Sequence, residues 1–317
     1  MLPTETQALF RALSVFAGGF TLDAVEAVAN PPRASAAPIL NDIRILAEHY
    51  LIQREQETDD APRFRMLELV CEFAQEQLDQ EGETRAIQQT HAEYFARWAK
   101  LKQVELYGPD RRCALRSYDR EHTNLRAALE WCRKARQPLT GLRLAAAASE
   151  YWRERGLVRE GYSWLHAFFP VAREAPEDVS AEAAFRLGTF AFWLGNHRRA
   201  QELGEELLAN SRGTGYDEGI GKALYLLASR PVPRDPLVAI SRLEEAIDFF
   251  ERASNPHWVA LCQGTLARWA MELGQFERAT CRRLGHDWGA ALALNWLGHV
   301  DVAWATTRAR SSASAKA

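Results

Sequence analysis

Apolar side chains recur every three to four residues through most of the chain, a period that predicts helices. The first stripe consists of Leu9, Phe10, Leu13 and Phe16. Thr4 and Gln7 fit a capping box at the start of this helix, and Gly18-Gly19 ends it. Thr21 is placed to cap a second helix, which runs to residue 29. After a proline-rich loop, the apolar face of a third helix is formed by Ile39, Ile43 and Leu46.

The pattern then changes to an extended one. Residues 50–54 and 63–66 are strand-like, and the polar residues 55–62 separate them, so we predict a β-hairpin. Three helices followed by a hairpin is the order of a winged helix. Helical periodicity resumes at Leu67, and the side chains expected to face inwards are Leu69, Phe73 and Leu78.

The helical spacing of apolar residues predicts a helical connector over residues 83–137. The apolar stripe of its long first helix is formed by Ile87, His91, Tyr94, Phe95, Trp98 and Leu101. Gly108-Pro109-Asp110 breaks the chain, and the inward face of the next helix is formed by Leu125, Ala128, Leu129 and Cys132. Neither His91 nor His122 has a partner at metal-ligand spacing, so we interpret both as satisfied or solvent-facing residues.

The C-terminal half shows an internal repeat whose clearest copy is residues 183–200, AAFRLGTFAFWLGNHRRA. Equivalent leucines recur at spacings of 40, 39 and 31 residues, at Leu187, Leu227, Leu266 and Leu297. The accompanying positions, interpreted as packing positions, are Gly188, Leu194, Gly195, Ala200, Leu273, Gly274, Ala279 and Gly298. Small residues let paired helices approach closely, and glycine suits the turns. The array resembles tetratricopeptide (TPR) repeats.

The array is expected to begin with a hairpin that turns at Arg155-Gly156-Leu157. Its last interval is short, so either the final hairpin is truncated or the final helix packs irregularly. We therefore divide the chain into a winged-helix module (1–82), a helical connector (83–137), TPR-like repeats (138–309) and a disordered Ser/Ala-rich tail (310–317). The predicted fold class is mainly all-α with one small β-hairpin.

Composition restricts the setting of the protein. The chain has 317 residues and a nearly balanced net charge of −3, and it lacks an apolar run long enough to cross a membrane. Five cysteines without C-x-x-C spacing are typical of reduced thiols and provide no zinc site. We therefore expect a cytoplasmic protein that binds neither a membrane nor a metal.

Local charge argues against DNA binding by the winged helix. Residues 1–80 contain six arginines and no lysine against thirteen acidic residues, a net charge of −7. The third helix, where base contacts would lie, offers Asn41, Asp42, Arg44 and Glu48. A DNA-binding face needs cations for the phosphates before it can read bases. This module presents the opposite charge.

The repeats offer candidate partner contacts. One hypothesis is that Arg198, Arg199, Lys222 and Arg268 line the groove of the array and attract an acidic segment. The alternative is that they are ordinary surface residues, because exposed Arg and Lys are the default on solvated helices. The array is also rich in tryptophan, at Trp193, Trp258, Trp269, Trp288, Trp296 and Trp304. Some of these could anchor a peptide, but packing between helices is the favoured interpretation.

Catalytic motifs are missing from the sequence. It contains neither an H-E-x-x-H motif nor a Ser-His-Asp order, and Glu205-Glu206 and Glu244-Glu245 point in different directions on their helices. Residues 219–223, GIGKA, imitate a phosphate-binding loop but lack its first glycine and its Ser or Thr. We predict no catalytic residue and no cofactor.

Several stretches together resemble the region that follows the nucleotide-binding domain in bacterial STAND signalling ATPases, the AfsR-like and LuxR-type large regulators. They are LFRALSVFAGGFTLDAVEAV, ILNDIRILAEHYLIQRE, PRFRMLELVCEFAQEQL, THAEYFARWA and EHTNLRAALEW. The resemblance implies that the winged helix packs on an ATPase core. Related proteins have a nucleotide-sensing Met-His-Asp motif where this chain has Met66-Leu67-Glu68. Leu67 has no imidazole, so we expect Met66 and Leu67 to be buried packing residues.

The main hypothesis is a non-catalytic regulatory module whose repeats bind a protein or small effector. By the resemblance, a nucleotide-binding partner lies upstream, on a longer chain or on a separate one, because Met1-Leu2-Pro3 falls near the end of the family's nucleotide-binding domain. The alternative is a transcription regulator that binds DNA through the winged helix. An enzyme would require a deep polar cleft with converging titratable groups.

Overall fold

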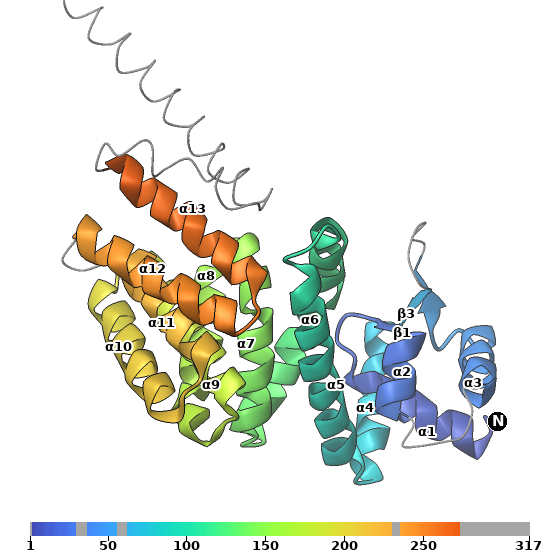
Figure 1. The fold of residues 1–317 in the computed structure, drawn as a ribbon. Helices are drawn as coiled ribbons and strands as arrows, with labels where there is room; N and C mark the ends of the chain where they lie inside the picture. The colour runs from blue at the N-terminus through green and yellow to red at the C-terminus, as the bar shows by residue number, and fades with distance from the viewer. Residues whose placement is uncertain (1, 30–36, 56–61, 230–234, 273–317) are drawn as a thin grey trace, which may run out of the picture. The chain divides into compact units, whose positions relative to one another are not determined.

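The computed structural model describes residues 2–29, 37–55, 62–229 and 235–272 (Figure 1). It forms two compact units, Met1–Ala175 and Pro176–Ala317. The predicted repeat positions outside the described residues are Leu273, Gly274, Ala279, Leu297 and Gly298. The predicted tail over residues 310–317 also lies outside them.

The first unit begins with the predicted winged helix. Its elements are α1 (Thr4–Ala12), the 3₁₀ helix η1 (Leu13–Val15), β1 (Phe20–Thr21), α2 (Leu22–Ala29), α3 (Ala37–Glu48), β2 (Gln53–Arg54), β3 (Arg63–Arg65) and α4 (Glu68–Gln80). The predicted hairpin of β2 and β3 is present, and β1 also pairs antiparallel with β3, which gives the strand order β1-β3-β2. The sequence pattern did not predict β1, because two residues are too few to show alternation.

The two predicted helix caps have different outcomes. Thr21 does cap α2, because its hydroxyl oxygen accepts from the Ala24 N–H at 3.3 Å. The capping box on α1 is wrong: the helix follows Pro3 with no side-chain cap, and Thr4 is already helical. The Gln7 side-chain amide instead donates to the Leu2 carbonyl at 2.7 Å.

Helix α4 turns a different face to the core than we predicted. Leu78 is fully buried, but Leu69 and Phe73 are 79% and 56% exposed. Nine residues separate Leu69 from Leu78, and at 3.6 residues per turn they point in opposite directions. The expected burial of Leu67 is also wrong, because its side chain is 44% exposed; Met66 is half-buried.

Four long helices complete the first unit: α5 (Thr84–Glu105), α6 (Arg111–Lys134), α7 (Pro138–Glu154) and α8 (Val158–Phe168), followed by η2 (Phe169–Glu174). The predicted break lies between α5 and α6, and the predicted inward face of α6 is fully buried at Leu125, Ala128, Leu129 and Cys132. Leu101 of α5 is exposed. Helices α7 and α8, which we expected to open the repeat array, belong to this unit and pack with α5 and α6.

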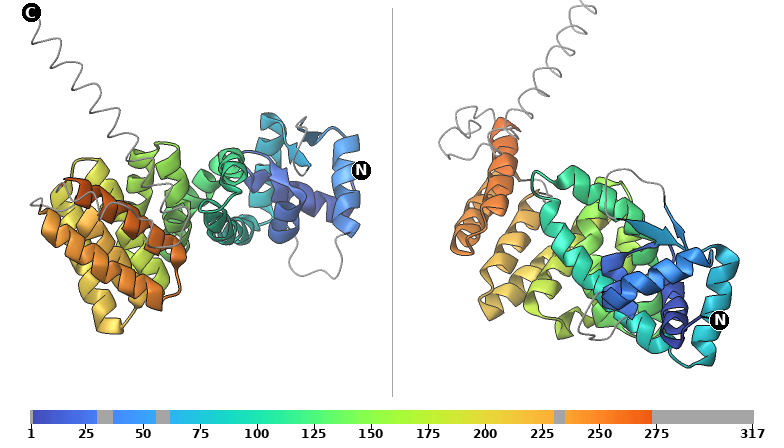
Figure 2. Two further views of the ribbon diagram at one scale, coloured as in Figure 1. Left: turned by 45° about the horizontal axis from the view of Figure 1, so that its top comes forward. Right: turned by 90° about the vertical axis from the view of Figure 1, so that its right-hand side faces the viewer.

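The second unit is a stack of helices: α9 (Glu177–Trp193), α10 (His197–Thr214), α11 (Asp217–Ser229), α12 (Pro236–Arg252) and α13 (Pro256–Glu272). Each helix packs on the next, and α9 also packs on α11 (Figure 2). This is the arrangement of stacked helical hairpins. Asp235 caps α12 by accepting from the Leu237 and Val238 N–H groups at 2.9 and 3.3 Å.

The clearest repeat copy forms the α9–α10 hairpin. Leu187 and Ala200 are buried, and a Cβ added to Gly188 would lie 2.6 Å from the Leu226 side chain. Gly195 has a φ of +85° in the turn, a conformation that favours glycine. Leu194, which we expected to pack, is instead 38% exposed at the end of α9. In the other described copies, Leu227 is buried and Leu266 is half-buried.

Candidate functional site

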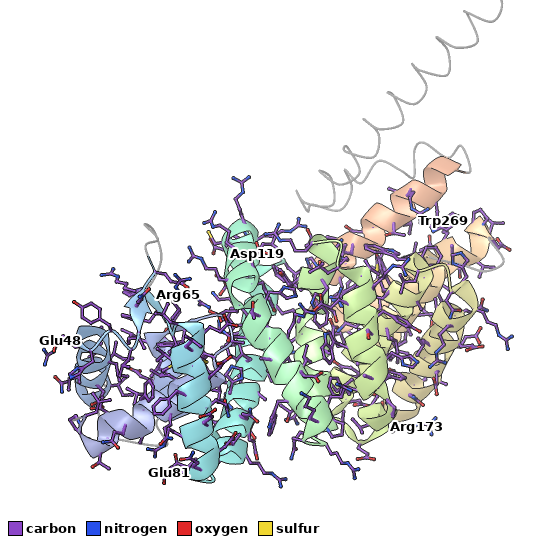
Figure 3. The ribbon with its side chains drawn as sticks, turned by 180° about the vertical axis from the view of Figure 1, so that it is seen from behind. Glu48, Arg65, Glu81, Asp119, Arg173 and Trp269 are labelled. Carbon is purple, nitrogen blue, oxygen red and sulfur yellow. The ribbon has the colours of Figure 1, made fainter. Side chains whose placement is uncertain are left out.

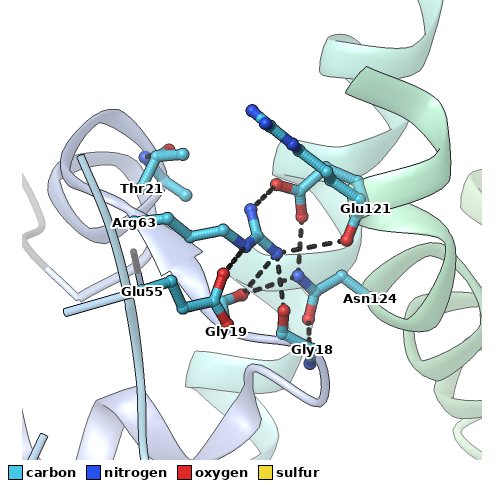
Figure 4. Close-up of polar contacts among 9 residues, drawn as sticks. Gly18, Gly19, Thr21, Glu55, Arg63, Glu121 and Asn124 are labelled. Carbon is cyan, nitrogen blue, oxygen red and sulfur yellow. Dashed lines mark hydrogen bonds and ion pairs between the residues drawn. The ribbon is translucent and has the colours of Figure 1, made fainter. Parts of the chain in front are cut away.

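Three segments far apart in the sequence meet in a buried polar cluster of the first unit (Figure 4). They are the turn before β1, the paired strands β2 and β3 with the residue after β2, and the middle of α6. We call this group the Arg63 cluster; its members are Gly18, Gly19, Glu55, Arg63, Glu121 and Asn124. These segments contain parts of the sequence stretches that carry the family resemblance.

Arg63 is the centre of the cluster, with a side chain only 8% exposed. Its guanidinium donates to a Glu121 carboxylate oxygen. It also donates to the Gly18, Gly19 and Arg120 carbonyls at 2.6, 3.1 and 3.2 Å. Its Nε lies 3.4 Å from the Glu55 carboxylate. A buried charge is tolerated only when it is paired and hydrogen-bonded, and the planar guanidinium fork meets this condition on several sides.

Asn124 completes the cluster and is fully buried. Its amide donates to the Gly19 carbonyl at 2.9 Å and to Glu121 at 2.7 Å. Its oxygen accepts from the Gly18 N–H at 3.3 Å. Gly19 has a φ of +80°, and a Cβ there would lie 2.8 Å from the Phe64 carbonyl oxygen. The glycine therefore allows the turn to approach both β3 and Asn124.

His91 lies beside this cluster on α5 and is buried between aromatic rings. Its ring centroid is 5.1 Å from that of Phe16 and 4.7 Å from that of Phe95. Burial lowers the pKa of His91 to about 3, and a hydrogen bond with Asn124 only partly opposes this. His91 is therefore neutral at physiological pH. The expectation of a satisfied histidine holds only in part: the ring bonds Asn124, but Nε2 is buried without a hydrogen-bond partner.

The charged groups of the Arg63 cluster face one another. The described residues contain no group of three His, Cys, Asp or Glu side chains that could hold a metal. Sequence analysis identified the segments but not the pairing of Arg63 with Glu121, nor the bond between Glu121 and Asn124. The sequence shows only a charged residue, Arg63, at the start of a predicted strand, and nothing in it indicates which carboxylate pairs with that residue.

The helix that would read DNA, α3, carries little free positive charge. Arg44 donates to Glu48 at 2.5 Å and to Asn41 at 3.0 Å, so its bonds stay within the helix. Glu48 lies on the outer side of α3 (Figure 3). Asp42 is buried and accepts from the Thr6 hydroxyl at 2.5 Å. Helix α3 therefore carries two carboxylates and one arginine, and that arginine is paired within the helix.

The structure distributes the four predicted partner contacts over three helices. Arg198 and Arg199 lie on α10 and both pair with Glu202, at 2.9 and 3.4 Å. Arg268 of α13 lies over the Trp269 ring, 4.5 Å from its centroid. Lys222 of α11 is buried, with a side chain 6% exposed. Lys222 is thus an internal ion-pair residue and not a surface residue of a groove.

Lys222 belongs to a buried ion cluster in the second unit. Its Nζ is 2.7 Å from both Glu182 and Glu218, and Arg186 donates to Glu182 at 2.8 Å. Burial would raise the pKa of Glu182, but the charges of Lys222 and Arg186 outweigh it and hold that pKa well below its ordinary value. Burial would lower the pKa of Lys222, but Glu182 and Glu218 raise it.

The imitation of a phosphate-binding loop around Lys222 has a packing explanation. Residues 219–223 lie within α11, and a Cβ on Gly221 would lie 2.7 Å from the Phe250 ring. Lys222 itself is bound by carboxylates. The glycines thus permit close helix contacts.

The described tryptophans of the array are mostly core residues. Trp258 is buried and stacks on Phe250, with centroids 5.2 Å apart. Trp269 is buried and donates to the Ala228 carbonyl at 3.0 Å. Trp193 is partly exposed at the end of α9. The tryptophans outside the described residues are Trp288, Trp296 and Trp304.

Comparison with known proteins identifies the N-terminal region. Residues 2–79 match the winged helix-turn-helix domain family. The chain is 33% identical over 167 residues to proteins titled "Putative HTH-type transcriptional regulator" from Mycobacterium tuberculosis and Mycobacterium bovis. The matched part is 52% of this chain and 19% of each relative, so the chain spans about a fifth of their length.

A solved structure also aligns with the chain. It is a Signal Transduction ATPase with Numerous Domains (STAND) protein with a tetratricopeptide repeat sensor from Pyrococcus horikoshii. The alignment covers 92% of this chain and 46% of that chain, with 14% identity and a TM-score of 0.48.

These findings define residues 2–79 as a winged helix-turn-helix domain and show homology to HTH-type regulators. The predicted winged helix is thereby confirmed, as is the mainly helical fold with a repeat region. Among the described residues, no helix is both long enough and apolar enough to cross a bilayer.

Proposed function

We propose that the chain is a non-catalytic regulatory module: its winged helix packs on a partner protein, and its helical repeats bind a protein or small effector. Homology to HTH-type transcriptional regulators supports the regulatory role. The buried, mutually paired charges of the Arg63 and Lys222 clusters are consistent with structural rather than catalytic chemistry.

The main observation in favour of a protein partner is the contrast between two surfaces of the winged helix. On α4 and the residue before it, Leu67, Leu69 and Phe73 are 44%, 79% and 56% exposed; we call these three residues the α4 apolar face. On α3, the exposed Arg44 is held by Glu48 and Asn41 of the same helix. Grouped exposed apolar side chains mark protein contact surfaces, whereas DNA requires available cations.

The partner that best fits this face is a nucleotide-binding ATPase domain. The resemblance of the sequence to STAND regulators implies such a domain next to the winged helix. An apolar face also suits a lasting contact between domains, because burial of Leu69 and Phe73 would contribute about 1.5–3 kcal/mol for each side chain. The repeats would then bias the partner between two states when an effector binds.

The test is complex formation with the Mycobacterium tuberculosis relative from which the segment matching this chain, 19% of its length, has been removed. Size-exclusion chromatography with light scattering should detect a complex with the wild-type chain. The variant Leu69→Asp with Phe73→Asp should lose it, because two carboxylates would be buried in an apolar contact. The control is Leu101→Asp, which changes a leucine on α5 that is 72% exposed. Equal binding by all variants would show that the α4 apolar face is not the surface that contacts the partner.

The alternative function is direct DNA binding, and the match of residues 2–79 to the winged helix-turn-helix family favours it. We place it second because residues 1–80 carry a net charge of −7.

A further inference from the structure

The Arg63 cluster connects the small sheet of the winged helix to α6. Arg63 starts β3, and its guanidinium binds carbonyls of the turn before β1. The same guanidinium binds Glu121 and the Arg120 carbonyl, both in the middle of α6. One buried side chain therefore contacts both the turn before β1 and the middle of α6, where Glu121 is 58 residues from Arg63 in sequence.

Glu55, the residue after strand β2, also contacts Arg63. The Glu55 N–H donates to the Arg63 carbonyl at 2.9 Å, and the Glu55 carboxylate lies 3.4 Å from Arg63 Nε. Arg63 thus pairs with two carboxylates, that of Glu55 after β2 and that of Glu121 on α6. Glu55 is 29% exposed, whereas Glu121 is buried. Any displacement of β3 away from α6 would separate Arg63 from Glu121 and leave this buried carboxylate without a cation.

We infer that Arg63 is the positioning residue that couples β3 to α6, so that the two open and close together. We call the hairpin of β2 and β3 the wing. An uncompensated buried charge is strongly unfavourable. If β3 opened locally, Glu121 would lose its cation, and the middle of α6 would open as well. Changes at the wing would then be transmitted to the helical connector. This inference holds whether the winged helix contacts a protein or DNA.

Hydrogen exchange of the full chain, followed by mass spectrometry, tests the coupling, because exchange rates report local opening. In Arg63→Met, the peptides covering residues 17–21 and 63–65 and those covering residues 117–127 should all exchange about tenfold faster or more. The matched control is Arg65→Met, which removes an exposed arginine from the same strand. It should change none of these peptides.

A second variant addresses a failure of Arg63→Met to fold. Glu121→Gln keeps the shape and one acceptor of Glu121 but removes its charge, so it should accelerate exchange in both segments by a smaller factor. Faster exchange confined to residues 53–65, with α6 unchanged in both variants, would overturn the inference. That result would limit Arg63 to a local role in the hairpin.

Discussion

At the residue scale, His91 should make the protein sensitive to acid. Its pKa is lowered to about 3 by burial, from an ordinary value of 6.5. Between these two values the unfolded chain binds a proton that the folded chain does not. Stability should therefore fall as the pH drops from 6.5 towards 3, by about 1.4 kcal/mol per pH unit from this residue.

The variant His91→Phe removes this dependence while it keeps an aromatic ring beside Phe16 and Phe95. Urea unfolding between pH 6.5 and pH 4 should give a shallower loss of stability than in the wild type. The exposed His49→Gln is the control for loss of an imidazole. An unchanged pH slope in His91→Phe would show that His91 is not protonated on unfolding.

Glycine packing gives a second residue-scale prediction. A Cβ on Gly188 would lie 2.6 Å from Leu226, so Gly188→Ala should destabilise the second unit by about 1–3 kcal/mol through overpacking. The control, Gly213→Ala, places a Cβ in open space on the same hairpin. It should stabilise by about 0.5–1 kcal/mol, because alanine favours helix. Thermal unfolding of both variants would check the opposite signs.

Single residues were the hardest feature to predict from sequence. Lys222 was expected at the surface, either in a groove or on a solvated helix, but it is buried beside Glu182, which lies forty residues away. Arg63 and Glu121 pair across 58 residues. The sequence shows no periodicity between such partners, so only the folded chain brings them together.

At the scale of elements, the Lys222 cluster should hold α9 and α11 together. Lys222→Met would leave Glu182 buried with one fewer cation, and we expect a loss of about 3–5 kcal/mol at pH 7. The control Arg198→Met removes a side chain that is 91% exposed, and its effect should be below about 1 kcal/mol.

The pH dependence of this effect has a defined sign. The lowered pKa of Glu182 means that its contribution is present above 4.5 and is lost as the pH falls through its folded value. The raised pKa of Lys222 means that its contribution is present below 10.5 and is lost as the pH rises through its folded value. The difference between wild type and Lys222→Met should therefore narrow below pH 4.5, because Glu182 can then take up a proton in the variant. Urea unfolding at pH 7 and pH 4 would measure it, and a constant difference would contradict the ion-pair account.

Elements with long periodic patterns were well predicted, and short ones were not. The 3.6-residue period defined α5 and α6 and the break between them. Strand β1 has two residues and is stabilised only by its pairing with β3. On α4, apolar residues occur on two opposite faces, so composition alone could not show that Leu69 and Phe73 remain exposed.

At the scale of the whole molecule, the chain folds as two units with their division at residues 175–176. Apolar pattern predicted the repeat architecture, but it could not predict that α7 and α8 join the first unit, since any helical hairpin shows the same periodicity. The domain boundaries proposed from sequence remain predictions. The net charge of −7 on residues 1–80 is the property on which our preference for a protein-binding winged helix rests.

We propose that this winged helix does not act by binding DNA. The most direct test of this proposal is a fluorescence anisotropy titration of the full chain against a labelled mixed-sequence duplex, at about 50 mM and about 200 mM salt. We predict no saturable binding at either concentration, since residues 1–80 carry a net charge of −7 and Arg44 is held by Glu48. Tight binding at the lower salt that weakens steeply at the higher one, and is lost in Arg44→Ala, would contradict the account.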